Sequence, residues 1–146
     1  MTKIISYNIN GIRAAIRKDI CSWLKKENPD VVCFQELKAY SSQFDESVFT
    51  DLGYNCNWFS AERPGYSGVG ILSKEQPNKV VHGMSNKKYD IEGRVISASF
   101  KEYTIISVYM PSGSTGDIRQ NYKIEFLEDR FNWKGENDVG KTHVKE

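Results

Sequence analysis

Two short polar segments contain the residue types that bind metal ions and phosphate groups. Asn8 and Asn10 follow a strand-like run at residues 3–7, and Glu36 follows an apolar run at residues 31–34. Taken singly, the first segment is typical of a tight turn and Glu36 of a surface glutamate. If the two runs are parallel strands, their carboxyl ends bring the carboxylate and the amides together at one edge of the sheet. Mg²⁺ prefers such oxygen ligands, so the pair indicates magnesium-assisted phosphate chemistry.

The elements that must position these residues alternate between strand and helix at the start of the chain. Apolar residues recur at helical spacing over residues 12–24, and Asn28-Pro29 ends this helix because the residue before a proline avoids helical geometry. The order strand, helix, strand predicts two parallel strands. Later apolar runs separated by turn residues predict an antiparallel meander. The runs cover residues 54–60, 69–73, 79–82, 95–100 and 103–109. Helical spacing returns at 118–133, with Tyr122 and Phe126 on one face and Phe131 as a third candidate for it.

Composition indicates an ordinary globular domain. The 146 residues suit one hydrophobic core, with 39% apolar and 27% charged residues. The 20 Lys and Arg against 19 Asp and Glu exclude a global basic field, so any contact with nucleic acid must be local. Three cysteines without metal-ligand spacing favour a reducing, cytoplasmic compartment. We expect neither a membrane span nor a signal peptide.

Five blocks of sequence, in the same order, resemble exonuclease III and the related abasic-site endonucleases. The blocks are IISYNINGIRA at residues 4–14, NPDVVCFQELK at 28–38, GYSGVGILS at 65–73, EGRVI at 92–96 and SVYMP at 107–111. The resemblance implies an α/β fold, a four-layer sandwich of two face-to-face sheets with helices outside. It also implies a DNA-repair hydrolase that cuts double-stranded DNA 5′ to abasic sites or at 3′ ends. The implied cofactor is Mg²⁺, with Mn²⁺ as an alternative.

The resemblance assigns roles to residues at the strand ends. It implies that Glu36 is a metal ligand and that Asn8 holds the metal or the scissile phosphate. Asn10 takes the place of an acidic or amide residue near the metal. Tyr109 is implied, with Asn8, as a catalytic residue, because its phenol is a neutral donor where charge develops on the phosphate. Without the resemblance, Tyr109 would be interpreted as a half-buried strand aromatic.

The same blocks imply a surface that binds the DNA backbone without reading bases. Cations neutralise phosphates there, and small residues let backbone amides approach them. Glu92 and Arg94 form either a supporting pair near the metal or DNA, or an ordinary solvated salt bridge. The implied DNA-binding residues are Arg13, Ala14, Lys18, Lys38, Gly65, Tyr66, Ser67, Gly68 and Arg94.

Two motifs that the family mechanism needs are missing. Gly-Asp-x-Asn would orient the attacking water and Ser-Asp-His would supply the catalytic histidine, but Gly116-Asp117 lacks the asparagine and neither His82 nor His143 adjoins an aspartate. We therefore expect residues 1–133 to be the N-terminal half of the domain and 134–146 an irregular polar tail. Acid-base groups contribute roughly 10²–10⁴-fold in rate, so we expect a truncated, inactive chain. We also expect self-association or a complementary chain to cover an open sheet face.

Three further interpretations bear on function. Residues 135–142 match the phosphate-loop pattern G-x-x-x-x-G-K-[ST], but a helix precedes them and only four residues follow, so the match is interpreted as coincidence.

A related phosphodiesterase acting on a non-DNA phosphate ester would use similar strand-end residues, although Tyr66-Ser67-Gly68 with Met110-Pro111 favours DNA. A non-catalytic remnant that binds DNA or metal is the alternative to an enzyme, and salt-dependent binding without turnover would identify it.

Overall fold

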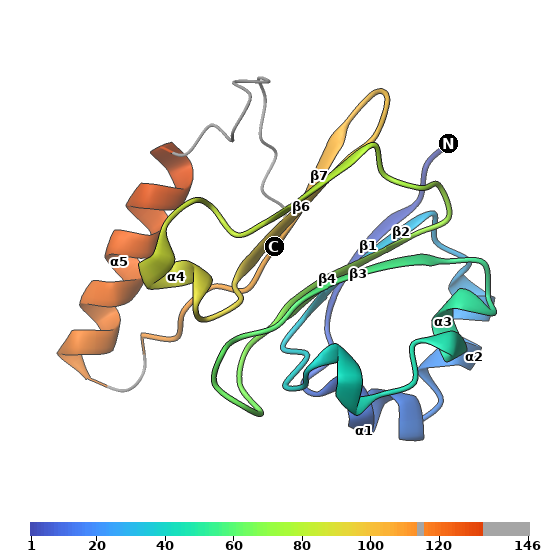
Figure 1. Cartoon of the computed structure of the whole chain (residues 1–146), viewed down its shortest axis with the longest axis horizontal. Helices are drawn as coiled ribbons and strands as arrows, with labels where there is room; N and C mark the ends of the chain where they lie inside the picture. The colour runs from blue at the N-terminus through green and yellow to red at the C-terminus, as the bar shows by residue number, and fades with distance from the viewer. Residues whose placement is uncertain (114–115, 133–146) are drawn as a thin grey trace.

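Two β-sheets packed face to face form the body of the molecule in the computed structural model, which describes residues 1–113 and 116–132 (Figure 1). The first sheet has the strand order β1-β2-β4-β3, with bounds Ile4–Asn8 (β1), Val31–Gln35 (β2), Asn55–Phe59 (β3) and Val69–Ser73 (β4). The second sheet has the order β5-β6-β7, with bounds Lys79–His82 (β5), Val95–Ser99 (β6) and Thr104–Val108 (β7). This is the α/β sandwich that the resemblance implied.

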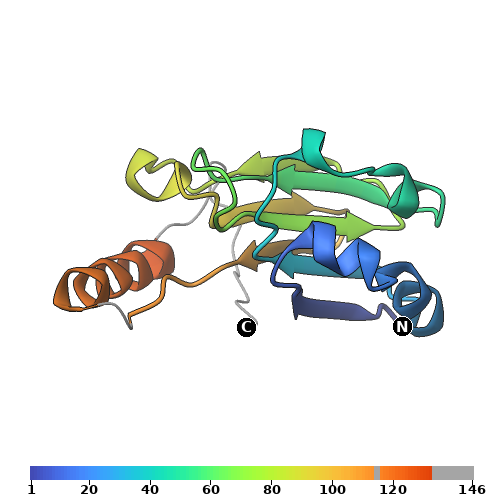
Figure 2. The ribbon, with the colours of Figure 1, turned by 90° about the horizontal axis from the view of Figure 1, so that it is seen from below.

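The helices fall into two groups (Figures 1 and 2). Helices α1 (Ile12–Arg17), α2 (Ile20–Glu27) and α3 (Ser47–Thr50) lie along the outer face of the first sheet, and the short 3-10 helix η1 (Ser41–Gln43) precedes α3. Helices α4 (Lys87–Asp90) and α5 (Asp117–Asn132) lie together beside the end of the second sheet. No helix of the described part of the chain is long and apolar enough to cross a membrane.

Strand β2 separates two layers of the hydrophobic core. Its residues are buried on both faces, which explains why its sequence is an unbroken apolar run rather than an alternating one. Val32 and Phe34 face the helices, where they pack with Leu24 and Phe49. Residues on the opposite face fill the space between the sheets, and this layer consists of Val31, Cys33, Val69, Ile71, Ile96, Ala98 and Phe100.

The open apolar surface is smaller than the sequence led us to expect. Strand β7 packs over β2 and β4, and β6 packs over β4 and β3, so the two sheets cover each other. The expectation of a whole exposed sheet face was therefore wrong. Among the described strands, β1 and β3 end the first sheet and β5 and β7 the second, so the outer edge of β1 is one of the unpaired edges (Figure 2). Ile4 and Tyr7 on this strand are 47% and 45% exposed.

The helix predicted over residues 12–24 is divided in two. Asp19 has a left-handed backbone with φ of 62°, and its carboxylate accepts a 3.3 Å hydrogen bond from the Ser22 amide. It also accepts a 2.5 Å bond from the Ser22 hydroxyl, so Asp19 caps the start of α2. The periodicity hid this break because Ile20 and Leu24 still point into the core.

The other predicted elements match the structure with two differences. The parallel pairing of β1 and β2 is confirmed, and the predicted strands lie within one residue of the observed ones. The single meander was wrong, because β4 pairs with both β2 and β3 and so belongs to the first sheet. The short helices α3 and α4 were missed, because four residues are too few to show a helical period.

The predicted last helix is confirmed as α5, and the two aromatics predicted for one of its faces pack inward. Phe126 is buried and Tyr122 packs beside it, against Met84 and Val95 of the second sheet region. The Phe131 side chain and the tail at 134–146, with the phosphate-loop pattern at 135–142, lie outside the described residues.

The layer between the sheets is testable by deleting part of one side chain. Ile71 is fully buried there, so Ile71→Ala should lower the free energy of unfolding by about 2–5 kcal/mol through lost burial and the cavity it leaves. Ile124, 45% exposed on α5, is the matched control, and Ile124→Ala should change stability by less than about 0.5 kcal/mol. Urea denaturation followed by circular dichroism measures both. Equal losses would contradict the two-sheet core.

Candidate active site

The carboxyl ends of β1 and β2 bring the predicted metal-binding residues into contact. In the parallel register Asn8 stands opposite Gln35, so the residues that follow each strand emerge side by side. Asn8 Nδ2 donates a 2.9 Å hydrogen bond to Glu36 Oε1. The Gly11 amide donates to the Glu36 carbonyl at 2.7 Å, which ties the two strand ends together through the backbone as well. Residues 28 positions apart in the sequence thus form one polar group.

The backbone around this group is strained. Asn10, Glu36 and Lys38 have positive φ values of 46°, 55° and 52°, in the left-handed region that residues other than glycine rarely adopt. Such conformations cost on the order of 1–3 kcal/mol each and concentrate at functional sites. Hydrogen bonds hold the chain there, since the Leu37 amide donates to Gly68 O at 3.1 Å and the Lys38 amide to Ser67 O at 2.9 Å.

Glu36 is an ionised carboxylate surrounded by donors. Partial burial acts to raise its pKa, but hydrogen bonds from Asn8, Tyr109 and Lys38 outweigh burial and lower the pKa. The Lys38 ammonium lies 3.4 Å from Glu36 Oε2 and donates a 2.6 Å bond to Asn10 Oδ1. The Glu36 side chain is 19% exposed, so it stays open to a cation from solvent.

Tyr109 follows β7 and reaches Glu36 from the second sheet. Burial raises the pKa of its phenol to about 12, and the negative charge of Glu36 and the hydrogen bond to it act in the same direction. The nearby Arg94 cation acts against this shift. The phenol is therefore a neutral hydrogen-bond donor at physiological pH.

The oxygen set suits a hard divalent cation that keeps most of its waters. One carboxylate from Glu36 and amide oxygens from Asn8 and Asn10 are the ligand types that Mg²⁺ takes from proteins. The Asn8 oxygen accepts a 3.0 Å bond from the Asn10 amide, and the Asn10 oxygen accepts from Lys38. Within the described residues, no group of three or more His, Cys, Asp or Glu side chains could hold a metal. Glu36 is the one negatively charged side chain of this oxygen set.

The predicted DNA-binding residues divide into exposed and buried ones. Arg13 and Lys18 are exposed on and just after α1, with Ala14 half-buried between them, and Arg13 Nη2 donates a 3.1 Å bond to Lys38 O. In the glycine-rich turn Gly65 is exposed and Tyr66 half-buried. These five residues and Lys38 lie around the Glu36 site or the turn beside it, and Arg13, Lys18 and Lys38 are the cationic members of the group.

Ser67, Gly68 and Arg94 are buried, unlike the exposed members of the predicted DNA-binding set. Ser67 and Arg94 are each 2% exposed, so their side chains present no surface to a DNA phosphate. Ser67 Oγ donates to Gly93 O at 3.4 Å, inside the protein. Gly68 is also buried, with φ of 90°, and a Cβ there would lie 3.1 Å from Leu37 Cβ. Close packing and backbone conformation require glycine at this position.

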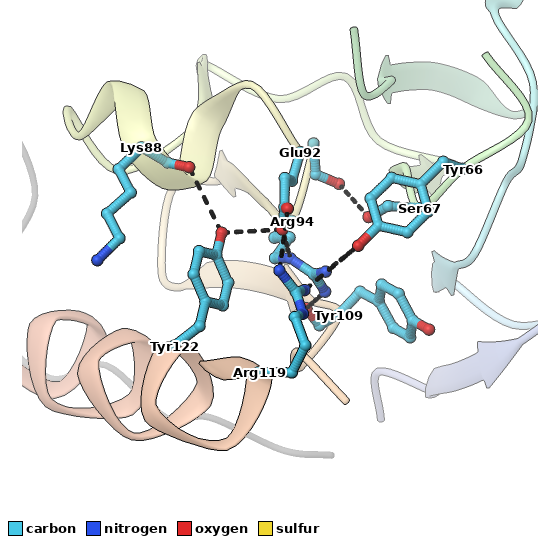
Figure 3. Close-up of polar contacts among 9 residues, drawn as sticks. Tyr66, Ser67, Lys88, Glu92, Arg94, Tyr109, Arg119 and Tyr122 are labelled. Carbon is cyan, nitrogen blue, oxygen red and sulfur yellow. Dashed lines mark hydrogen bonds and ion pairs between the residues drawn. The ribbon is translucent and has the colours of Figure 1, made fainter. Parts of the chain in front are cut away.

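Glu92 and Arg94 form a partly buried ion pair rather than a solvated salt bridge. Arg94 Nε donates to Glu92 Oε2 at 2.6 Å, and the side chains are 2% and 18% exposed (Figure 3). Two residues that sequence reasoning missed join them from α5. Tyr122 donates a 2.8 Å hydrogen bond to Glu92 Oε2, and Arg119 Nη1 lies 3.6 Å from Glu92 Oε1. The inward-facing position of Tyr122 was the one signal available in the sequence.

Comparison with known proteins adds independent evidence. Residues 5–141 match the model of the Endonuclease/Exonuclease/phosphatase family. An exodeoxyribonuclease of Bacillus subtilis is 38% identical over 127 residues, which are 86% of this chain and 49% of the relative. The DNA repair nuclease APEX1 of Danio rerio is 35% identical over 123 residues, 83% of this chain and 40% of the relative.

A solved structure agrees with the fold. The AP endonuclease of Archaeoglobus fulgidus superposes with a TM-score of 0.82 at 31% identity, over 92% of this chain and 51% of that protein. The chain thus spans about half the length of the relatives it matches. The matched family model covers most of the sequence and includes Asn8, Glu36 and Tyr109. The chain therefore belongs to the Endonuclease/Exonuclease/phosphatase family, among its relatives of the exonuclease III and abasic-site endonuclease type.

Proposed function

We propose that this chain carries the metal-binding half of a DNA-repair active centre that hydrolyses phosphodiester bonds 5′ to abasic sites or at 3′ ends. The observation that carries the proposal is that Asn8 and Tyr109 both hydrogen-bond the Glu36 carboxylate, Asn8 at 2.9 Å. Relatives described as an exodeoxyribonuclease and a DNA repair nuclease support the reaction class.

The residues divide the chemistry among themselves. Glu36, with Asn8 and Asn10, would hold Mg²⁺, or Mn²⁺ as an alternative. The bound metal supplies Lewis-acid polarisation of the scissile phosphate. Tyr109 keeps its proton at neutral pH and donates a hydrogen bond toward a phosphate oxygen as negative charge develops there. Arg13, Lys18 and Lys38 neutralise flanking phosphates and position the duplex without reading its bases.

The proposal includes two partners, the DNA substrate and a second polypeptide that completes the fold. The substrate is double-stranded DNA. The chain alone binds this DNA without turnover, because the groups that activate water belong to the part of the fold that only the longer relatives contain. A non-catalytic remnant that binds DNA or metal is the alternative, and a related phosphodiesterase acting on another phosphate ester is a further one. Three free cysteines fit a reducing compartment, and we propose the cytoplasm.

Incision of a labelled duplex with one abasic-site analogue tests the function. We expect no incision by the chain alone in Mg²⁺. Adding a polypeptide with the unmatched half of the Bacillus subtilis relative should produce incision that EDTA abolishes. Glu36→Gln should slow it by about 10²-fold or more, since the charged metal ligand is lost. A folded complex that never cuts would contradict the nuclease assignment. Incision by the chain alone, lost in Glu36→Gln, would keep the assignment and refute the need for a second half.

The DNA-binding surface is testable without catalysis. Fluorescence anisotropy in EDTA should show DNA binding whose logarithmic binding constant falls linearly with the logarithm of the salt concentration, because phosphate contacts release counterions. Lys18→Ala should reduce the magnitude of that slope by about 0.9. Lys101, exposed in the turn between β6 and β7, is the matched control, and Lys101→Ala should leave the slope unchanged. Equal effects of the two substitutions would remove the surface around α1 from the proposal.

The open edge of β1 is the surface proposed to receive the complementary half. Its unpaired amides and carbonyls are a template for another strand. In the absence of that half, we propose that a second copy of this chain pairs there, with Ile4 and Tyr7 contributing apolar area.

A charge at this edge tests the self-association. Sedimentation velocity at micromolar concentration should show a dimer that Ile4→Lys converts to monomer, because a lysine on an edge strand opposes pairing. Ile118→Lys is the control, since Ile118 is 84% exposed on α5, away from the edge. Addition of the complementary polypeptide should also dissociate the dimer. A wild-type monomer would refute pairing between copies.

A further inference from the structure

Arg94 is buried, and each of its guanidinium nitrogens has a partner (Figure 3). Nε donates to Glu92 Oε2 at 2.6 Å, Nη2 donates to the Tyr66 hydroxyl at 2.8 Å, and Nη1 donates to the Tyr109 carbonyl at 3.2 Å. A guanidinium with donors committed in three directions has little freedom to rotate. Arg94 therefore fixes the relative positions of residues from three separate parts of the chain.

Three tyrosine rings surround the same guanidinium. The Arg94 Cζ atom lies 5.1 Å from the ring centre of Tyr109, 5.8 Å from that of Tyr66 and 6.0 Å from that of Tyr122. A cation over an aromatic face is attracted by the ring, and the attraction grows as water is excluded. The charge of Arg94 thus acts on the orientation of the rings as well as on their hydrogen-bonding atoms.

Tyr109 is held by Arg94 at its backbone and ring, and its phenol is left for the candidate metal site. The Tyr109 amide donates to the Arg94 carbonyl at 2.9 Å, which complements the bond from Nη1. Figure 3 shows the Tyr109 phenol pointing away from the cluster toward β1. There it hydrogen-bonds Glu36. Tyr109 therefore bridges the buried arginine and the candidate metal ligand.

Helix α5 braces the arginine through Glu92. Tyr122 donates to Glu92 Oε2 at 2.8 Å and Arg119 Nη1 lies 3.6 Å from Oε1, so both carboxylate oxygens have partners besides Arg94. The Arg119 guanidinium stacks 4.4 Å from the Tyr122 ring centre. Residues about 30 positions from Glu92 thus determine where the Arg94 counterion sits.

We propose that Arg94, held by Glu92 and braced from α5 by Tyr122 and Arg119, is a positioning residue that sets the orientation of the Tyr109 phenol on Glu36. The proposal rests on the proposed function for its catalytic meaning, because it assigns Tyr109 a working geometry. It replaces the direct DNA contact predicted for Arg94. It also gives α5 a role in the site although no α5 residue contacts Glu36 in the interactions described.

Stability alone gives a weaker account of this cluster. A buried ion pair is costly to desolvate, and a well-packed apolar group of the same volume is often as stabilising. The pair does, however, impose directions, since its hydrogen bonds reach Tyr66 and Tyr109 at defined atoms. A geometric role explains why the cation lies among three tyrosines rather than among apolar side chains.

Tyrosine ring resonances, read by carbon-13 NMR without metal or DNA, test the proposal. The chain has eight tyrosines, and Tyr109→Phe identifies the resonance of interest. Arg94→Gln should shift the Tyr109 ring resonances by tenths of a part per million or broaden them. Arg94→Lys, which keeps the cation, should restore them in part. Tyr54 is the internal control, because its hydroxyl bonds Pro29 O at 2.7 Å in the helix-side core, and it should not move.

Tyr122→Phe removes only one hydroxyl and keeps the buried charges paired. If Arg94→Gln does not fold, the Tyr109 resonances of this second variant test the proposal. It should shift Tyr109 in the same direction by a smaller amount. Unchanged Tyr109 resonances in a folded Arg94→Gln protein, or in Tyr122→Phe if the former does not fold, would overturn the proposal. Equal shifts at Tyr54 and Tyr109 would also overturn it, because they would indicate a general loosening. The result is independent of incision, so failure of the nuclease assignment is recognised separately.

Discussion

The parallel pairing of β1 with β2 is the constraint on which the rest of the structure depends. Parallel strands end at the same edge of a sheet, so Asn8 and Glu36 meet at 2.9 Å only in this arrangement. Because a parallel connection needs a crossover, α1 and α2 must lie on one face of the sheet. The opposite face is then left for the second sheet, which brings Tyr109 to the same carboxylate.

The strain at Glu36 is supported by segments that are distant in sequence. Its left-handed backbone is tolerable because the next two amides bond to Gly68 and Ser67. Ser67 in turn bonds to Gly93, next to Arg94, and Arg94 bonds to Tyr109. The five sequence blocks that carry the family resemblance thus form one connected set of hydrogen bonds. A substitution in the turn at Ser67 and Gly68, or at a residue that contacts Arg94, should therefore alter the conformation of Glu36.

Sequence reasoning was most successful where a local pattern determines structure. Strand ends, the parallel pair and the meeting of Asn8 with Glu36 followed from apolar runs and their order. The cap at Asp19 was missed because periodicity continues through it. The burial of Arg94 and its contacts with α5 were also missed, because nothing local distinguishes a buried arginine from a surface one. Such contacts depend on how α5 packs, which a single sequence does not specify.

The charges around Glu36 couple the proposed metal and DNA ligands. Lys38 already stands 3.4 Å from the carboxylate, so a divalent cation at Glu36 alone would leave a site with excess positive charge. A DNA phosphate supplies the missing negative charge, and it can accept from Lys38 as the metal takes the carboxylate. In the proposed function, metal and DNA would therefore favour each other's binding, and linkage makes this coupling reciprocal. In the proposed function, the lysine keeps the site neutral between substrates and makes occupation by metal depend on the phosphate that is to be cut.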